Sequence, residues 1–229
     1  MNILKGTLPN SKNYKRGRSS SIKYIVIHYT ANKGDTALNN VKYFANNVVG
    51  ASAHYFVDEN NVYSSVPELD TAWHCGGNKQ SNTGGKWYKK CTNSNSIGIE
   101  MCLLDKNGDV KNLTIMKTVE LTKHLMNKYD IPAENVIRHW DVTGKYCPKP
   151  FAGDNNAYWQ DFKNRITDQG GDTMIYNNID NNMPSFARPT IQKLCDKGYL
   201  KGDGKGLDLT YDMLRILTIL DRAGVFDKE

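Results

Sequence analysis

The strongest strand signal in the chain is KYIVIHYTA, at residues 23–31. Its Ile, Val and Tyr content is typical of a buried strand, in which successive side chains point to opposite faces of a sheet. Ile25 and Ile27 therefore point to one face, while Val26 and His28 point to the other. The stretch predicts a central strand that carries a histidine near its end.

The segments around this strand alternate between strand and helix patterns. We expect a hairpin from the short runs at 54–58 and 61–66, a second central strand at 96–104, and a strand-like run at 136–140. Apolar residues at helical spacing predict helices at 36–47, 113–129 and 158–166. The alternation predicts an α/β domain with a mixed central β-sheet flanked by helices.

A change in composition divides the chain after this domain. We expect a catalytic domain at 1–166, a polar Asn- and Gly-rich linker at 167–183, and a small, mainly helical domain at 184–229. Two helices alone form a small core, so the last domain is expected to dock or to self-associate.

Composition excludes several classes of protein. Of the 229 residues, 39% are hydrophobic and 24% are charged, which permits a packed core and excludes general disorder. No apolar run approaches the ~20 residues of a membrane-spanning helix. The first 25 residues lack the apolar stretch of a signal peptide, so we expect a protein that is not secreted by that route.

The net charge of +6 lies in the first 171 residues, because residues 172–229 hold 8 basic and 9 acidic side chains. A basic body is compatible with nucleic acid, a membrane surface, a bacterial cell wall, or solubility alone. No nucleic-acid-binding motif is present, so a nucleic-acid partner is not expected.

Histidine and cysteine side chains suggest a metal site. His28 ends its strand, His139 ends the run VIRHW, and Cys147 follows eight residues later in a Pro-flanked loop. Two imidazoles and one thiolate are zinc ligands, and three protein ligands leave a fourth position open, as in catalytic sites. The spacing by itself is a weak signal and favours the alternative, two hydrogen-bonded histidines and a buried thiol.

Five motifs occur in the order found in one enzyme family. They are Tyr24–Ala31 (YIVIHYTA), Ser52–Val57 (SAHYFV), Ala72–Gly76 (AWHCG), Asn95–Glu100 (NSIGIE) and Arg138–Pro148 (RHWDVTGKYCP). Over about residues 20–165 the chain resembles the type 2 N-acetylmuramoyl-L-alanine amidases, which include phage endolysins and peptidoglycan recognition proteins. The resemblance implies a mixed sheet flanked by helices, with a zinc ion in a cleft. It also implies hydrolysis of the amide between N-acetylmuramic acid and L-alanine in peptidoglycan.

The resemblance also assigns roles to residues. His28, His139 and Cys147 match the ligands of one Zn²⁺ per chain, and Glu100 and Lys145 match acidic and basic catalytic residues. Some members place a Tyr where this chain has Ala53, which makes Glu100 the better candidate for the general base. A surface salt bridge for Glu100 and a solvated charge for Lys145 are the alternatives.

Other residues inside the motifs have weaker assignments. Trp73 and His74 are expected to contact substrate, although His74 is also compatible with a packing role. We expect His54 to be structural. Cys75 is expected to have no role of its own, with a disulfide to Cys91 left open.

These expectations define a biological hypothesis. The chain is expected to be a phage or prophage endolysin that stays in the host cytoplasm until lysis and then acts on the cell wall. A bacterial autolysin, a sporulation amidase and a non-catalytic peptidoglycan-binding protein are the alternatives. The C-terminal domain faintly resembles an S-layer-homology-type wall-binding motif, so a secondary wall polymer is a possible ligand.

The linker prompts a separate hypothesis. The codons of Gly170, Gly171 and Asp172 can spell a ribosome-binding sequence just before Met174. Translation from Met174 would produce a 56-residue piece that pairs with the C-terminal domain of the full chain. An ordinary flexible linker is the alternative.

Overall fold

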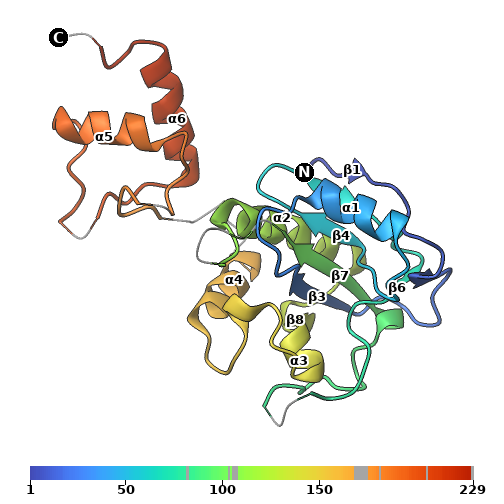
Figure 1. The fold of residues 1–229 in the computed structure, drawn as a ribbon. Helices are drawn as coiled ribbons and strands as arrows, with labels where there is room; N and C mark the ends of the chain where they lie inside the picture. Colours follow the sequence, from blue (N-terminus) through green and yellow to red (C-terminus); the bar gives the residue numbers. More distant parts are fainter. Residues whose placement is uncertain are drawn as a thin grey trace. The chain divides into compact units, whose positions relative to one another are not determined.

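The computed structural model describes residues 1–80, 83–102, 104, 108–167, 175–180, 182–204 and 206–227. The chain forms two compact units, Met1–Thr167 and Asp168–Glu229, each considered by itself below (Figure 1). Among the described helices, none combines the length and apolar character needed to cross a membrane.

The first unit is built on a six-stranded sheet with the order β1-β5-β4-β7-β3-β8. Its strands are β1 (Leu4–Lys5), β3 (Tyr24–Tyr29), β4 (Tyr55–Val57), β5 (Val62–Ser64), β7 (Ser96–Met101) and β8 (Val136–Arg138). The β4–β5 hairpin is antiparallel, and the other neighbouring strands pair in parallel. The predicted mixed sheet is therefore confirmed. A separate two-stranded sheet pairs β2 (Tyr14–Lys15) with β6 (Thr71–Ala72) in antiparallel orientation.

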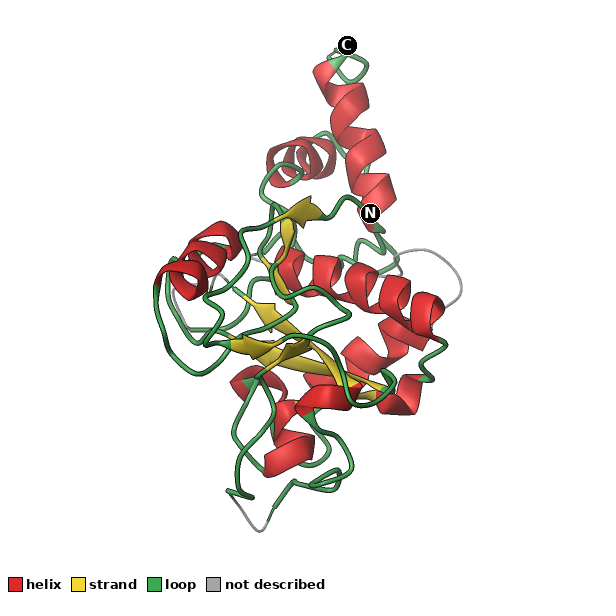
Figure 2. Ribbon diagram, turned by 90° about the vertical axis from the view of Figure 1, so that its right-hand side faces the viewer, coloured by secondary structure: helices red, strands yellow, loops and turns green. Residues whose placement is uncertain are grey.

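Helices cover both faces of this sheet (Figure 2). On one face, Ile25, Ile27, Ile97 and Ile99 pack against apolar residues of α2 (Asn112–Tyr129) and α4 (Ala157–Thr167). On the other face, α1 (Ala37–Asn46) packs over Phe56 of β4, while α3 (His139–Thr143) lies beside β3 and β8. This second face carries Val26 and His28, as the alternation in residues 23–31 predicts.

Local signals explain where the helices begin and end. The Thr36 hydroxyl accepts a hydrogen bond from the Asn39 N–H and caps α1. Asp130 adopts a left-handed conformation, with φ of 50°, and ends α2 before Pro132. Three short 3₁₀ helices, Asn93–Asn95, Ala133–Asn135 and Lys149–Phe151, occupy connections.

One sequence expectation near the site is wrong. The strand predicted at 136–140 ends at Arg138, and His139 is the first residue of α3. The reason is a local cap: the Asp141 carboxylate accepts hydrogen bonds from the Arg138 backbone N–H and from its guanidinium group. A carboxylate in the first turn stabilises a helix N-terminus, so the strand ends two residues before the predicted end at Trp140.

The second unit has a core of its own. It contains α5 (Arg188–Asp196) and α6 (Tyr211–Arg222), close to the two predicted helices. Tyr176 and Met183 are buried in this core, and Tyr176 bridges to Leu209. Part of the segment that we expected to be linker therefore belongs to the packed unit. Residues 168–174 lie outside the described residues, and Met174 with them.

Candidate metal and catalytic site

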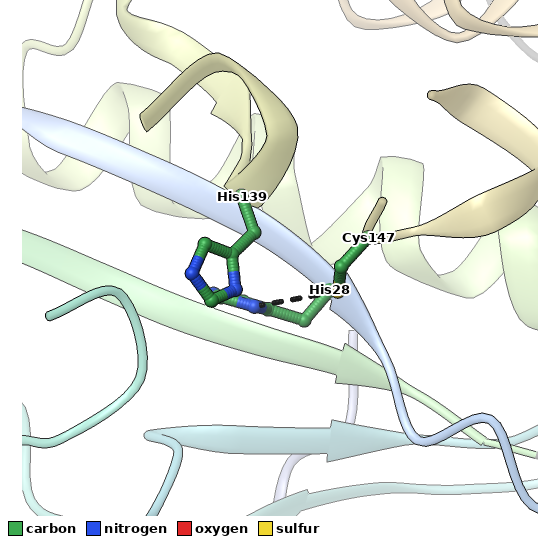
Figure 3. A group of neighbouring side chains, drawn as sticks. All are labelled: His28, His139 and Cys147. Carbon is green, nitrogen blue, oxygen red and sulfur yellow. Dashed lines mark hydrogen bonds between the residues drawn. The ribbon is translucent and has the colours of Figure 1, made fainter. Parts of the chain in front are cut away.

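His28, His139 and Cys147 converge on one point of the first unit (Figure 3). One possible ligand atom from each residue lies within 4.8 Å of the others. The Cys147 Sγ lies 3.8 Å from the His28 Nδ1, and the two imidazole centroids are 4.7 Å apart. Ligands of a tetrahedral zinc ion, at bond lengths of about 2.0–2.3 Å, lie roughly 3.3–3.8 Å from one another. The cluster is therefore close to the dimensions of a zinc site.

Strand register explains why these residues meet. β3 and β8 are parallel, and Ile27 pairs with Arg138, so His28 and His139 follow at neighbouring strand ends. Cys147 returns to them because the Trp140 N–H donates a 2.9 Å hydrogen bond to the Cys147 carbonyl. Gly144, with φ of 79°, ends α3 in the left-handed conformation that this return requires.

His139 has the properties of a metal ligand. Among the described residues, neither of its ring nitrogens has a hydrogen-bond partner, although both are buried. Burial, with smaller contributions from Lys145 and His74, lowers the pKa of His139 to about 3, so the ring is neutral. Burial likewise holds the pKa of His28 well below its usual range. Buried polar atoms normally have partners, and a metal ion would supply one here. The residues present fit a zinc ion.

A hydrogen-bond chain sets the orientation of His28. The Ser96 hydroxyl donates its only proton to the Thr92 carbonyl, at 2.6 Å, so its oxygen accepts from His74 Nε2, at 3.1 Å. A ring that carries its proton on Nε2 leaves Nδ1 as an acceptor. His74 Nδ1 lies 3.0 Å from His28 Nε2, which therefore donates. This leaves the lone pair of His28 on Nδ1, the nitrogen that faces Cys147.

Two residues of this arrangement were not predicted. Ser96 orients His74, and Gly98 makes room for it, because a Cβ at Gly98 would lie 2.6 Å from His74 Cγ. Both share a face of β7 with Glu100. The sequence NSIGIE contains a signal for this arrangement. Side chains alternate along a strand, so residues 96, 98 and 100 are expected on one face of it.

Glu100 lies beside the cluster on the same face of the sheet. It pairs in register with His28 across β3 and β7, and in parallel strands such pairs point the same way. Its Oε2 is buried and has no hydrogen-bond partner in the described part of the chain. Burial raises the pKa of Glu100 to about 7, although Lys145 opposes this shift and Asp35 adds to it. Such a carboxyl group can accept or give a proton near neutral pH.

Lys145 is exposed, and its charge acts on the site. The Lys145 ammonium lowers the pKa of both Glu100 and His139. For each of these groups, only burial has a larger effect. The Cys147 N–H donates a 2.7 Å hydrogen bond to the Lys145 carbonyl, which closes a tight turn between the two residues.

The two expected substrate contacts lie in different surroundings. His74 contacts His28 and Ser96, whereas Trp73 lines a cavity of about 390 Å³ together with Tyr88, Cys75 and Cys91. His54 is fully buried, and its Nδ1 accepts a hydrogen bond from the Gly98 N–H. Its Nε2 lies 2.6 Å from an Arg18 guanidinium nitrogen. These contacts give His54 a structural environment.

The fold and site together define a class of protein. An α/β domain with two neutral imidazoles, a thiol and a carboxyl group of raised pKa has the residue types that can hold a metal ion and move a proton. Residues 18–150, more than half of the chain, match the N-acetylmuramoyl-L-alanine amidase family. The chain belongs to this family.

Individual relatives agree with this assignment. The chain is 36% identical over 167 residues to the N-acetylmuramoyl-L-alanine amidase BlyA of Bacillus subtilis strain 168, covering 69% of this chain and 45% of that protein. It is 34% identical over 142 residues to the amidase CwlL of Bacillus licheniformis, covering 60% and 39%. The chain thus spans less than half the length of these curated relatives.

Solved structures show the same fold. PlyL superimposes with a TM-score of 0.61 at 28% identity, over 74% of this chain and 99% of PlyL. The catalytic domain of XlyA superimposes with a TM-score of 0.58, also at 28% identity, over 72% and 99%. These structures share the α/β fold of the first unit.

Proposed function

We propose that this protein is a zinc-dependent peptidoglycan hydrolase that cleaves the amide between N-acetylmuramic acid and L-alanine. One observation carries the proposal: His28 and Cys147 converge on the buried ring of His139, beside Glu100, in a domain of the amidase family. His28, His139 and Cys147 would hold one zinc ion. When bound, zinc supplies Lewis acidity, which makes water a nucleophile at neutral pH and polarises a carbonyl group.

The remaining roles fall to the chain's own residues. Glu100 takes a proton from the attacking water and returns it to the leaving amine, because its pKa of about 7 suits both steps. Lys145 stabilises the negative charge that develops on the carbonyl oxygen. His74 holds the ring of His28, and Trp73 offers a face on which a sugar or peptide can stack.

The reaction is tested by digesting purified peptidoglycan. We expect new L-alanine amino termini and no new reducing sugar ends. New reducing ends would identify a glycosidase instead, and binding without either product would identify a non-catalytic peptidoglycan-binding protein. Metal analysis of the same preparation should find one zinc per chain. Cys147→Ser should lose most of that zinc together with activity, and full zinc content in this variant would remove Cys147 from the ligand set.

We further propose that the protein acts as a phage or prophage endolysin, which stays in the host cytoplasm until the membrane opens. Likeness to the "Mutant endolysin from Bacillus subtilis", at 30% identity and a TM-score of 0.58, supports this proposal. Cells that express the protein should stay intact until an agent permeabilises the membrane, and should then lyse. Lysis without permeabilisation would favour an autolysin or sporulation amidase.

For the second unit we propose binding to a secondary wall polymer, with self-association as the alternative. Its separate core supports an independent function, and exposed Met213, Ile216 and Ile219 on α6 offer an apolar surface. The full chain should cosediment with native walls more than with walls stripped of phosphodiester-linked polymers. Equal cosedimentation, together with a dimer in sedimentation velocity, would favour self-association instead.

The fragment that begins at Met174 stays a proposal of its own. Expression from the native gene followed by intact mass spectrometry should reveal it beside the full chain. Silent recoding of Gly170 and Gly171 together with Met174→Leu should remove it. A fragment that persists after recoding would be a product of proteolysis.

A further inference from the structure

Two thiols outside the candidate site lie side by side. Cys75 and Cys91 are both free and both buried, and they pack in one cluster with Val26, Ile137 and Val142. Cys75 Sγ lies 3.6 Å from the Ser96 hydroxyl. Both thiols are free, and they share one buried cluster and one cavity wall.

A small molecule can reach this pair from the surface. Cys75 and Cys91 both line the cavity of about 390 Å³, whose wall also includes the exposed Lys15, Gly77 and Lys89. Cys102 differs, because it is fully buried in another cluster and faces Asn40. A reagent that enters this cavity from solvent therefore meets Cys75 and Cys91 but not Cys102.

The two thiols are chemically unequal. The neighbouring Cys91 thiol is the largest influence on Cys75, and it holds the pKa of Cys75 well below its usual range despite burial. The Cys75 thiol, with burial, raises the pKa of Cys91. A thiolate is the nucleophile in thiol oxidation. Cys75 is therefore suited to react first, and Cys91 is placed to resolve the product.

We propose that Cys75 and Cys91 form a peroxide-sensitive dithiol that closes to a disulfide. In the first step, the Cys75 thiolate attacks hydrogen peroxide, the O–O bond breaks, and Cys75 becomes a sulfenic acid as hydroxide leaves. In the second step, the Cys91 sulfur attacks the Cys75 sulfur, the S–O bond breaks, and the S–S bond forms. Overall, two thiols and one peroxide yield one disulfide and two waters, with two electrons transferred.

The disulfide would act on the segment beside the candidate site. It would close the loop from 75 to 91, which begins directly after His74. Closing a loop of this length reduces the conformational entropy of the unfolded chain. We therefore expect the oxidised protein to melt roughly 5 °C or more above the reduced protein. This inference does not depend on the proposed amidase activity.

The test uses the full, metal-loaded chain. The protein is treated with hydrogen peroxide, quenched with catalase, denatured and alkylated with N-ethylmaleimide, and its intact mass is measured. The reduced chain should take five labels, one for each cysteine. The oxidised chain should lose two labels, and dithiothreitol should restore them. Five labels after peroxide treatment would overturn the proposal.

Peptide mapping identifies the sulfur atoms involved. Trypsin places Cys75 in peptide 43–79 and Cys91 in peptide 91–106, so the disulfide should join these two peptides. Peptide 91–106 also contains Cys102, and fragment ions must therefore assign the bond to Cys91. A bond to Cys102, or to Cys147 on its separate peptide, would contradict the proposal.

Serine variants provide the matched controls. Cys75→Ser should keep all four remaining labels after peroxide. Cys91→Ser should lose only the Cys75 label, because its oxidation stops at the sulfenic acid. Neither variant should yield the disulfide-linked pair of peptides. Cys195→Ser removes a cysteine of the second unit and should still lose two labels. If a serine variant at 75 or 91 fails to fold, the peptide map of the unaltered chain still decides the question.

Discussion

The Nδ1 of His74 lies 3.0 Å from the Nε2 of His28, and the opposite nitrogen of the His28 ring faces Cys147. A histidine outside the candidate ligand set therefore fixes which nitrogen of His28 can bind a metal. The Ser96 hydroxyl holds His74 in turn, so the orientation of His28 depends on two residues that would not touch the ion.

We expect His74→Ala to weaken zinc binding by roughly 10–100-fold, because side chains that hydrogen-bond to a metal-bound histidine have effects of this size. Ser96→Ala should weaken it less, since His74 would keep its contact with His28. Competition with a chromophoric chelator measures both affinities. His124→Ala is the matched control, because His124 is exposed on α2 and should leave zinc affinity unchanged. Unchanged affinity in His74→Ala would contradict the proposed role of the hydrogen-bond chain.

We expect Gly98→Ala to lower both stability and zinc affinity. The new Cβ would lie 2.6 Å from His74 Cγ, and the imidazole ring is held by hydrogen bonds at both nitrogens. Overpacking of this kind costs about 1–3 kcal/mol in the free energy of unfolding. Urea titration and chelator competition measure the two effects. A variant with native stability would show that His74 moves away without cost.

Glu100→Gln should retain zinc but lose most activity. The amide is close in size to the carboxyl group but cannot accept the proton of the attacking water, and general bases contribute roughly 10²–10⁴-fold to rate. Release of L-alanine amino termini from peptidoglycan measures the rate, and metal analysis shows whether zinc is kept. Activity near that of the unaltered chain would exclude Glu100 as the general base.

Stability should fall in acid as Glu68 becomes protonated. Burial alone would raise the pKa of Glu68, but hydrogen bonds from Lys128, Tyr129 and Tyr55 outweigh it and hold the pKa below its usual range. A lowered pKa means that the stabilisation is complete above the pKa of the unfolded chain, near 4.5. It is lost as the pH falls through the lower pKa of the folded chain.

Glu68→Gln tests this pH dependence. At neutral pH the variant should lose about 1–2 kcal/mol of stability, because the hydrogen bonds then reach a neutral acceptor. Below pH 4 its melting temperature should fall less steeply with pH than that of the unaltered chain. Parallel curves for the two proteins across the acid range would rule out a contribution from Glu68.

Much of the first unit was predictable because its signals are local. Apolar residues at 23–31 and 96–101 define the two central strands, and apolar residues at helical spacing indicate the helices at 36–47 and 113–129. The order of the five motifs was enough to indicate the family. Each of these signals can be recognised in a few neighbouring residues, or in their order along the chain.

Other features depended on contacts between distant segments. Tyr176 pairs with Leu209, more than 30 residues away, and therefore belongs to the second unit and not to the expected linker. Trp73 and His74 are neighbours in sequence but have different surroundings. Trp73 lines a cavity, whereas His74 contacts His28.

The sequence by itself thus determined the central strands, most of the helices and the residue types of the site. Only the tertiary structure decided which ring nitrogen of His28 faces Cys147 and that Cys75 and Cys91 line one cavity. Hydrogen-bond direction and the lining of a cavity depend on how separate strands and loops pack in space. A pattern of residue types along the chain does not contain that information.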